Sequence, residues 1–290
     1  MPTLDDILTR ADALLERVET LLPRVPTSID WNKTQAARWR HHNRGHLEAV
    51  AHPHHLRLTD MRCIDDQKQE LDRNTRQFLA GVPANNALLW GSRGTGKSSL
   101  VKALLNSYAK QGLRLIEVDR SDLAALPDIV AGLPAQPWRF LIYCDDLSFE
   151  AGDASYKTLK AMLDGSIAAA PDNVLVYATS NRRHLLPERM EDNQDTRLIG
   201  TELHHGEAVE ERISLSERFG LWLSFHPFTQ DEYLEIVFHW LKRLKADCDD
   251  RDQIRAEALR FALARGSRSG RVAYQFARDW AGRMALADNS

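Results

Sequence analysis

The sequence predicts an α/β protein in which helices cover both faces of a parallel sheet. Short runs that are apolar throughout alternate with helical segments from about residue 64 onward, as they do in buried parallel sheets. A glycine-rich loop stands between one of these runs and the helix after it. The strands stop after Pro227, and three helical segments follow. We therefore expect a three-layer αβα core, followed by a small C-terminal helical lid and preceded by a helical N-terminal appendage.

The composition is that of an ordinary globular chain of one or two domains. The 290 residues carry a formal net charge of −3, which argues against a bulk nucleic-acid coat protein. Only 3 cysteines are present, without C-x-x-C spacing, so the sequence indicates a reducing compartment and not a disulfide scaffold. It contains no signal-peptide pattern and no run of about 18 apolar residues. We expect a cytoplasmic protein without membrane contact.

The N-terminal part differs in composition from the rest. Residues 3–22 place apolar side chains at a 3.6-residue period and predict an amphipathic helix. Residues 31–62 hold six Lys or Arg against two acidic residues, and six of the eleven histidines. We expect an appendage over residues 1–60, an α/β domain over residues 61–226 and the helical lid over residues 227–290.

The apolar runs and periodic segments give the elements in order. The expected strands are Ala87–Gly91, Leu113–Asp119, Phe140–Asp145, Val174–Thr179 and Leu221–Phe225. The helices among them are Asp66–Leu79, Lys97–Gln111, Ala154–Ala168 and Glu207–Ser216. The lid helices cover residues 229–246, 251–265 and 270–286, with glycines marking the last gap.

The strongest motif follows the first of these strands and opens a helix. It matches G-x-x-x-x-G-K-[ST], the P-loop or Walker A pattern. The expected phosphate-binding residues are Gly91, Ser92, Arg93, Gly94, Thr95, Gly96, Lys97, Ser98 and Ser99. Glycines let backbone N–H groups wrap the phosphates, and the helix N-terminus turns its positive dipole end toward them. Lys97 would contact the β- and γ-phosphates, and the Ser98 hydroxyl would bind Mg²⁺.

Polar side chains follow two further strands. The run R-F-L-I-Y-C ends in Asp145 and Asp146, which is the Walker B arrangement. Asp145 would hold Mg²⁺, and Asp146 would polarise the attacking water as a general base, with Glu150 as a weaker candidate. Asn181 follows the strand Val174–Thr179. An amide at that place would orient the water between Asp146 and the γ-phosphate.

Three arginines complete the set of candidates. Arg218 ends a helix just before the last strand, where it could reach a phosphate across a subunit interface. Arg268 and Arg271 stand at the start of the final helix, an unfavourable place for cations that suggests a bound anion.

Together these motifs resemble an AAA+ ATPase over about residues 60–290. Stretches such as PANNALLWGSRGTGKSSLVKALLN, YCDDLSFE and SLSERFGLWLSF resemble an uncharacterised bacterial AAA+ family, a domain of unknown function. The stretch around Arg218 is also similar to a box of bacterial replication initiators. The resemblance implies ATP as the nucleotide, an arginine finger at Arg218 and sensor 2 at Arg271, with Arg268 second. It also implies that Ile64 covers the adenine.

The sequence departs from the usual AAA+ pattern in two respects. Walker B normally ends Asp-Glu, whereas Asp146 is shorter by one methylene, a displacement that can slow a reaction about 10²-fold. Residues 112–137 contain no aromatic residue, although polypeptide-threading machines carry an aromatic pore loop there. Slow hydrolysis is therefore expected, and an unfoldase is not.

The basic segment leaves its role open. Trp31 and Trp39 interleave with Arg38, Arg40 and Arg44, a composition used for single-stranded nucleic acid, for protein contacts, or simply for packing. The nearby histidines lack the cysteine pair of common zinc sites, so a metal site is not expected.

These observations predict an ATPase that converts ATP to ADP and phosphate with Mg²⁺. An arginine finger in trans implies a homo-oligomer, which would act on a macromolecular partner, more plausibly a protein than a nucleic acid. Two alternatives remain open. One is a slow or non-hydrolysing ATP-dependent switch or scaffold, and the other is an initiator- or loader-like nucleic-acid-binding ATPase.

Overall fold

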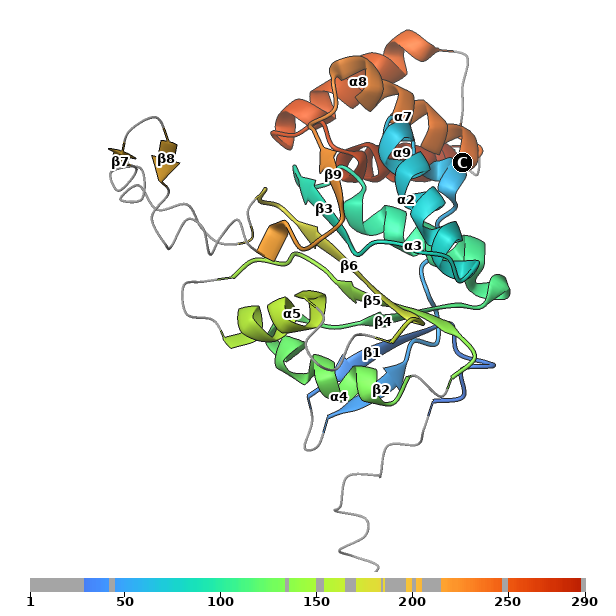
Figure 1. Cartoon of the computed structure of the whole chain (residues 1–290). Coiled ribbons are helices and arrows are strands. Elements are labelled where there is room, and N and C mark those ends of the chain that lie inside the picture. Colours follow the sequence, from blue (N-terminus) through green and yellow to red (C-terminus); the bar gives the residue numbers. More distant parts are fainter. Residues whose placement is uncertain are drawn as a thin grey trace, which may run out of the picture.

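The computed structural model describes residues 29–41, 45–133, 136–149, 154–164, 171–183, 185, 215–246 and 250–287, and the backbone of residues 197–199 and 202–204. The helix expected over residues 3–22, most of the helix Glu207–Ser216, Arg44 and the candidate base Glu150 lie outside these residues. The described chain forms a seven-stranded sheet with helices on both faces (Figure 1).

The strands lie in the order β2-β1-β4-β5-β6-β3-β9. Their bounds are β1 Ala36–Arg40, β2 His46–Ala49, β3 Ala87–Gly91, β4 Leu113–Glu117, β5 Arg139–Cys144, β6 Val174–Ser180 and β9 Leu221–Phe225. All neighbours are parallel except β1 and β2. A separate antiparallel pair consists of β7 Arg197–Ile199 and β8 Glu202–His204. Since β5, β6 and β3 are adjacent and parallel, their carboxyl ends meet at one edge, where open α/β sheets bind ligands.

Each face of the sheet has its own hydrophobic core, because side chains alternate along a strand. Leu141 and Tyr143 of β5 pack with the helices α2 Asp65–Leu79 and α3 Lys97–Tyr108 and with the lid. Phe140 and Ile142 of the same strand face the opposite layer. That layer holds α4 Leu126–Ala131 and α5 Ala154–Asp164 (Figure 1). The predicted three-layer αβα core is thus confirmed.

The lid consists of α7 Gln230–Arg243, α8 Arg251–Ala264 and α9 Gly270–Ala287. Thr229 begins α7 as an N-cap, with its hydroxyl accepting from the backbone N–H of Glu232, and Asp250 caps α8 in the same way. Tyr233 and Phe276 join the lid to the core beside α3. Of the helices that the structure describes, none is long and apolar enough to cross a membrane.

The five strands predicted from apolar runs are all present, with ends within a few residues. The helix expected over Lys97–Gln111 ends at Tyr108 and continues as a 3₁₀ turn over Ala109–Gln111. The helix expected from Ala154 is described as far as Asp164.

The described part of the N-terminal segment differs from the expected helical appendage. Strands β1 and β2 extend the sheet beyond β4. Arg38 of β1 donates to Glu117 of β4 at 2.6 Å, whereas Trp31 and Trp39 are only 6% and 8% exposed. Trp31, Trp39 and Arg38 therefore serve sheet packing, which favours the packing alternative for this segment.

Candidate nucleotide-binding site

The loop between β3 and α3 takes the form of a phosphate cradle. Gly91 has a φ of 125°, and a Cβ on it would lie 2.0 Å from the Phe225 carbonyl oxygen of β9, so only glycine fits there. At Gly94 a Cβ would lie 2.8 Å from Ser269, and the Gly94 carbonyl accepts from the Gly270 N–H at 2.9 Å. The loop therefore contacts the start of α9, while the N–H groups of the first turn of α3 have no partner within the helix.

Lys97 lies at the centre of this cradle and is only 6% exposed. Its ammonium group donates to the carbonyl oxygens of Gly91 and Ser92, both at 2.7 Å, and to Asn181 Oδ1 at 3.2 Å. Burial lowers the pKa of Lys97 to about 8, although the carboxylates of Asp146 and Asp145 oppose the shift. A buried cation held by weak carbonyl acceptors is suited to bind a phosphate oxygen.

Asp145 follows β5 and is held by two hydroxyl groups. Its Oδ1 accepts from Ser98 Oγ at 2.7 Å and from Thr179 Oγ1 at 2.5 Å. Partial burial raises its pKa, but these hydrogen bonds outweigh burial and leave the pKa below its usual value. An ionised carboxylate beside a serine hydroxyl provides the hard oxygen ligands that Mg²⁺ prefers. The residues thus fit the metal that the sequence predicts at Ser98 and Asp145.

Asp146 and Asn181 form a second pair directly beside the first. The Asn181 amide donates to the Asp146 carboxylate, while the Asp146 N–H donates to Thr179 Oγ1 at 2.9 Å. Asp146 has a φ of 50°, an uncommon conformation for a residue other than glycine. The turn after β5 therefore separates the two carboxylates, one toward Ser98 and one toward Asn181.

Thr179 was not among the predicted site residues. Its hydroxyl joins Asp145 to the backbone of Asp146. The signal for it is its place as the second-last residue of β6, the strand beside β5. A polar residue at the end of an otherwise apolar central strand indicates a contact with the neighbouring loop.

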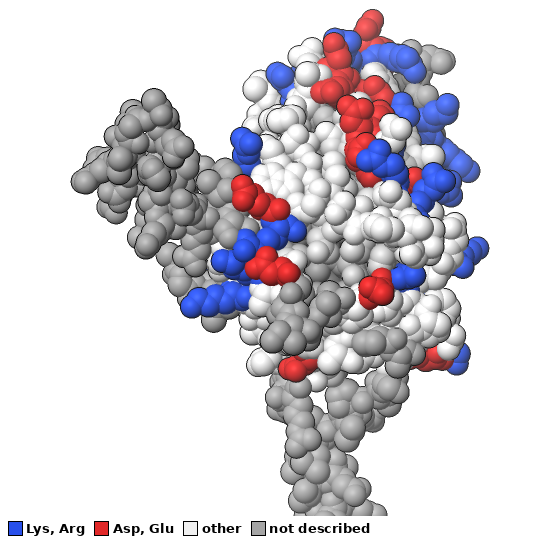
Figure 2. All heavy atoms as spheres, in the orientation of Figure 1, with Lys and Arg blue, Asp and Glu red and all other residues white. Residues whose placement is uncertain are grey.

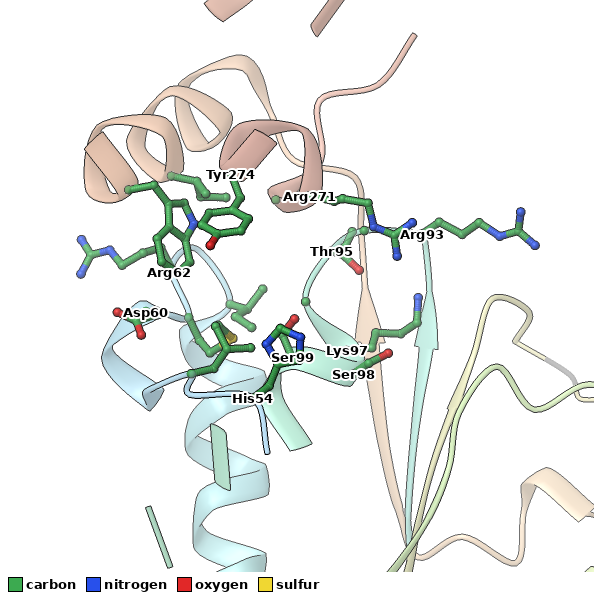
Figure 3. A pocket seen from close by; sticks show the side chains of 18 of the residues that line it. His54, Asp60, Arg62, Arg93, Thr95, Lys97, Ser98, Ser99, Arg271 and Tyr274 are labelled. Atoms are coloured by element: carbon green, nitrogen blue, oxygen red, sulfur yellow. The ribbon is translucent and has the colours of Figure 1, made fainter. Parts of the chain in front are cut away.

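A cavity of about 840 Å³ opens above these groups (Figure 3). Its polar end includes the P-loop, both carboxylates and Asn181. The apolar end is formed by side chains of the α2 entry and the lid, namely Met61, Ile64, Phe228, Ile236, Trp240 and Tyr274. Ile64, which the resemblance implies as the adenine contact, is one of these lining residues. The rings of Trp240 and Tyr274 lie 4.6 Å apart between centroids, and Tyr274 is 38% exposed. Such an aromatic wall can stack on a base.

The candidate arginines lie in three different places. Arg93 and Arg271 line the cavity, and Figure 3 shows both beside the P-loop. Arg268 is exposed and is not among the lining residues. Arg218 is also not among them, and it forms an ion pair with Asp164 at the end of α5. The structure therefore brings Arg271 to the site, but not Arg218 of the same chain.

Charged side chains on the face shown in Figure 2 are mixed in sign. Over the lid, Lys and Arg alternate with Asp and Glu, and they do not gather into one basic stripe among the described residues of this face. A groove for a nucleic-acid backbone requires such a stripe.

Comparisons with known proteins agree with the fold. A family model described as "Protein of unknown function (DUF815)" matches residues 32–284, and no curated protein matches the chain. Among solved structures, the chain resembles the RuvB Holliday junction branch migration motor of Thermotoga maritima, with 17% identity and a TM-score of 0.51. The match covers 77% of this chain and 63% of the motor chain. A point-substituted form of that motor matches with 15% identity and a TM-score of 0.50, over the same shares of both chains.

The chain thus spans less than two thirds of the motor's length, and the likeness shows the fold alone. The family match extends over most of the sequence, including β1 and the whole nucleotide site. The chain therefore belongs to the DUF815 family of unknown function, and it has the AAA+ fold that the sequence motifs predicted.

Proposed function

We propose that this protein is a cytoplasmic AAA+ ATPase that hydrolyses ATP to ADP and phosphate with Mg²⁺. One observation supports this most strongly. Lys97, Asn181 and Asp146 form one chain of hydrogen bonds, beside the pair Ser98 and Asp145. These five residues lie on the segments that follow three adjacent parallel strands, with Lys97 and Ser98 at the start of α3 after the P-loop. The chemistry of ATP hydrolysis needs a phosphate-binding cation, a metal ligand set and a base together.

The roles follow from the contacts. The P-loop N–H groups and Lys97 would hold the β- and γ-phosphates, while Ser98 and Asp145 would hold Mg²⁺, which supplies charge neutralisation for the leaving phosphate. Asn181 orients the Asp146 carboxylate. Water attacks the γ-phosphorus, the bond to the bridging oxygen of ADP breaks, and Asp146 accepts the proton of the water.

The lid and a neighbouring subunit complete the site in this proposal. The lid over residues 227–290 closes on the α/β domain of residues 61–226, to which β1 and β2 are joined. Arg271 lines the cavity from the lid and would contact the γ-phosphate as sensor 2. Arg218 lies outside its own chain's cavity, which supports a finger role in a neighbouring subunit of a homo-oligomer.

The partner is proposed to be a macromolecule, with a protein favoured over a nucleic acid. The aromatic residues that suggested nucleic-acid binding, Trp31 and Trp39, are buried, and Arg38 is paired with Glu117. A loader that acts on nucleic acid is therefore the weaker alternative. It predicts salt-dependent DNA or RNA binding at about 50 mM salt.

The stronger alternative is a switch in which ATP binding orders the oligomer and hydrolysis is incidental. The shorter Asp146 favours it, since this carboxylate is also engaged by Asn181. Steady phosphate release at about 1 s⁻¹ by the purified protein would remove this alternative.

The proposal as a whole is tested by nucleotide binding and phosphate release. Lys97→Ala should abolish ATP binding, and Asp146→Asn should retain ATP while turnover stops. Wild-type affinity in the Lys97→Ala protein would overturn the site. The Asp146→Asn protein can then serve to retain and identify the partner by affinity purification.

A further inference from the structure

Part of the segment over residues 52–58 lines the nucleotide cavity, and the ATPase machinery does not explain it. The segment leads from β2 to the 3₁₀ turn Leu58–Asp60. Three consecutive residues of it, His54, His55 and Leu56, line the cavity together with the P-loop. The histidine-rich stretch thus contributes side chains to the site.

Asn106 of α3 holds this segment in place. Its side-chain amide donates to the carbonyl oxygen of His54 and, at 2.8 Å, to that of Leu56. The Leu56 N–H donates to the His54 carbonyl at 3.1 Å, which tightens the turn. The backbone of His54 is therefore fixed on the surface of α3.

The anchor holds the His54 backbone on the face of α3 that also carries Ser99. Asn106 lies seven residues after Ser99, which is two helical turns, so both residues are on the same face of α3. Ser99 lies in the first turn and lines the cavity with His54. In the view of Figure 3 the His54 ring overlaps Ser99, and both residues line the cavity.

The position of Ser99 identifies the part of the nucleotide that His54 would meet. Lys97 serves the β- and γ-phosphates, and Ser98 faces the metal ligand Asp145. The base lies at the apolar end around Ile64. Between these two ends lie the α-phosphate and the ribose. We infer that His54 donates a hydrogen bond to the α-phosphate of the bound nucleotide and that Asn106 is its positioning residue; this rests on the proposed nucleotide binding.

The described part of the histidine-rich stretch offers single side chains for ligand binding. No group of three or more His, Cys, Asp or Glu side chains within the described residues is arranged to hold a metal ion. His54 is exposed to the cavity and engages α3 through its backbone, so its ring is available to a ligand. A phosphate oxygen is the anion that this end of the cavity is built to receive.

The test is the dissociation constant of ADP and ATP for the full chain, measured by calorimetry. If His54 makes a hydrogen bond to a charged phosphate, His54→Ala should raise the dissociation constants of both nucleotides by about tenfold. The loss should be equal for ADP and ATP, because both carry the α-phosphate. It should also persist with 2′-deoxy-ADP and 3′-deoxy-ADP, which lack one ribose hydroxyl each. His54→Gln, which keeps a donor, should recover part of the affinity.

His52→Ala is the matched control, because His52 is exposed on the same segment and is not among the cavity residues. It should bind as wild type does. Asn106→Ala should weaken ADP binding, but the double variant should be no weaker than His54→Ala alone. This non-additivity would separate positioning from general destabilisation.

Three outcomes would overturn the inference. The first is an unchanged affinity of His54→Ala while Lys97→Ala loses binding, which leaves the ATPase proposal intact. The second is a loss that disappears with either deoxynucleotide, since the contact would then be with the ribose. The third is a loss in His55→Ala but not in His54→Ala. If wild-type protein binds no nucleotide, both proposals fail together.

Discussion

The side-chain amide of Asn181 donates a hydrogen bond to the carboxylate of Asp146. Its oxygen accepts from Lys97 at 3.2 Å, so one side chain joins the proposed base to the cation proposed to bind phosphate. Asn181→Ala should leave Lys97 on its two loop carbonyls and release Asp146. We expect turnover to fall about 10²-fold while ADP affinity changes little.

A cycle of variants separates this pairing from independent effects. If Asn181 acts by orienting Asp146, then Asn181→Ala combined with Asp146→Ala should be no slower than Asp146→Ala alone. Phosphate release under saturating ATP measures this. If the fold-losses of turnover in the two single variants multiply in the double variant, Asn181 acts on a group other than Asp146. Asn32→Ala is the control, because Asn32 is an exposed asparagine that bonds to Asp30, far along the chain from the site.

The lowered pKa of Lys97 predicts a pH dependence of nucleotide binding. The pKa is about 8 in the folded protein, chiefly because of burial, and phosphates bind the ammonium form. We expect the dissociation constant of ADP to be about tenfold higher at about pH 9 than at about pH 7, since roughly a tenth of Lys97 is then protonated. Lys97→Arg should remove this dependence, because guanidinium stays charged.

The lowered pKa of Lys97 also affects the stability of the nucleotide-free protein. Nucleotide affinity should fall as pH rises, but the free energy of unfolding should increase. The pKa of Lys97 lies below its unfolded value of 10.5, so the unfolded chain binds more protons between these values. The free energy of unfolding should therefore gain a contribution as pH rises from about 8 to about 10.5. Lys97→Met should lose this contribution, whereas Lys110→Met, at an exposed lysine, should keep it. Identical pH profiles of these two variants in urea unfolding would contradict the assignment.

Most of the core fold could be predicted because its strands are buried on both faces. Such strands are apolar throughout, and β5 and β6 show this in sequence and structure alike. The P-loop, Asp145 and Asn181 could be located for the same reason, since each follows a buried strand. Their mutual contacts confirm that the motifs meet at one edge.

Two features of the structure could not be predicted from the sequence, for a physical reason. Strand β1 alternates buried Ala37 and Trp39 with charged Arg38 and Arg40, and Arg38 becomes neutralised only when Glu117 of β4 lies beside it. That partner is 79 residues away along the chain, so no local pattern shows it. The aromatic wall of Trp240 and Tyr274 could not be predicted either. Both residues occur within ordinary amphipathic lid helices, where aromatic side chains are expected in the core.

Asp60 ends the 3₁₀ turn Leu58–Asp60 and links this turn to α7 of the lid. Its side chain is 1% exposed, pairs with Arg243 of α7, and accepts from the Arg57 N–H at 2.9 Å. Asp60→Ala would leave the partly buried Arg243 without this partner, which should lower the free energy of unfolding by about 3 kcal/mol. The control is Arg62→Ala, which removes an exposed pair with Glu235 and should cost about 1 kcal/mol or less. Equal losses of unfolding free energy in the two variants, measured by urea unfolding, would show that the Asp60 pair stabilises the protein no more than an exposed ion pair.

Arg218 provides the last prediction, which concerns the oligomer. It lies outside the cavity of its own chain, where it pairs with Asp164, so its proposed target is a γ-phosphate bound by a neighbour. Arg218→Ala should therefore keep ATP affinity and lose turnover by about 10³-fold, the scale of an arginine finger. Lys97→Ala should lose ATP binding but keep its own Arg218. When the two inactive variants are mixed and allowed to exchange subunits, each competent P-loop of the first can receive a finger from the second. Phosphate release should then reappear in the mixture, in proportion to the mixed interfaces. A mixture that stays inactive after verified subunit exchange would mean that Arg218 does not act in trans.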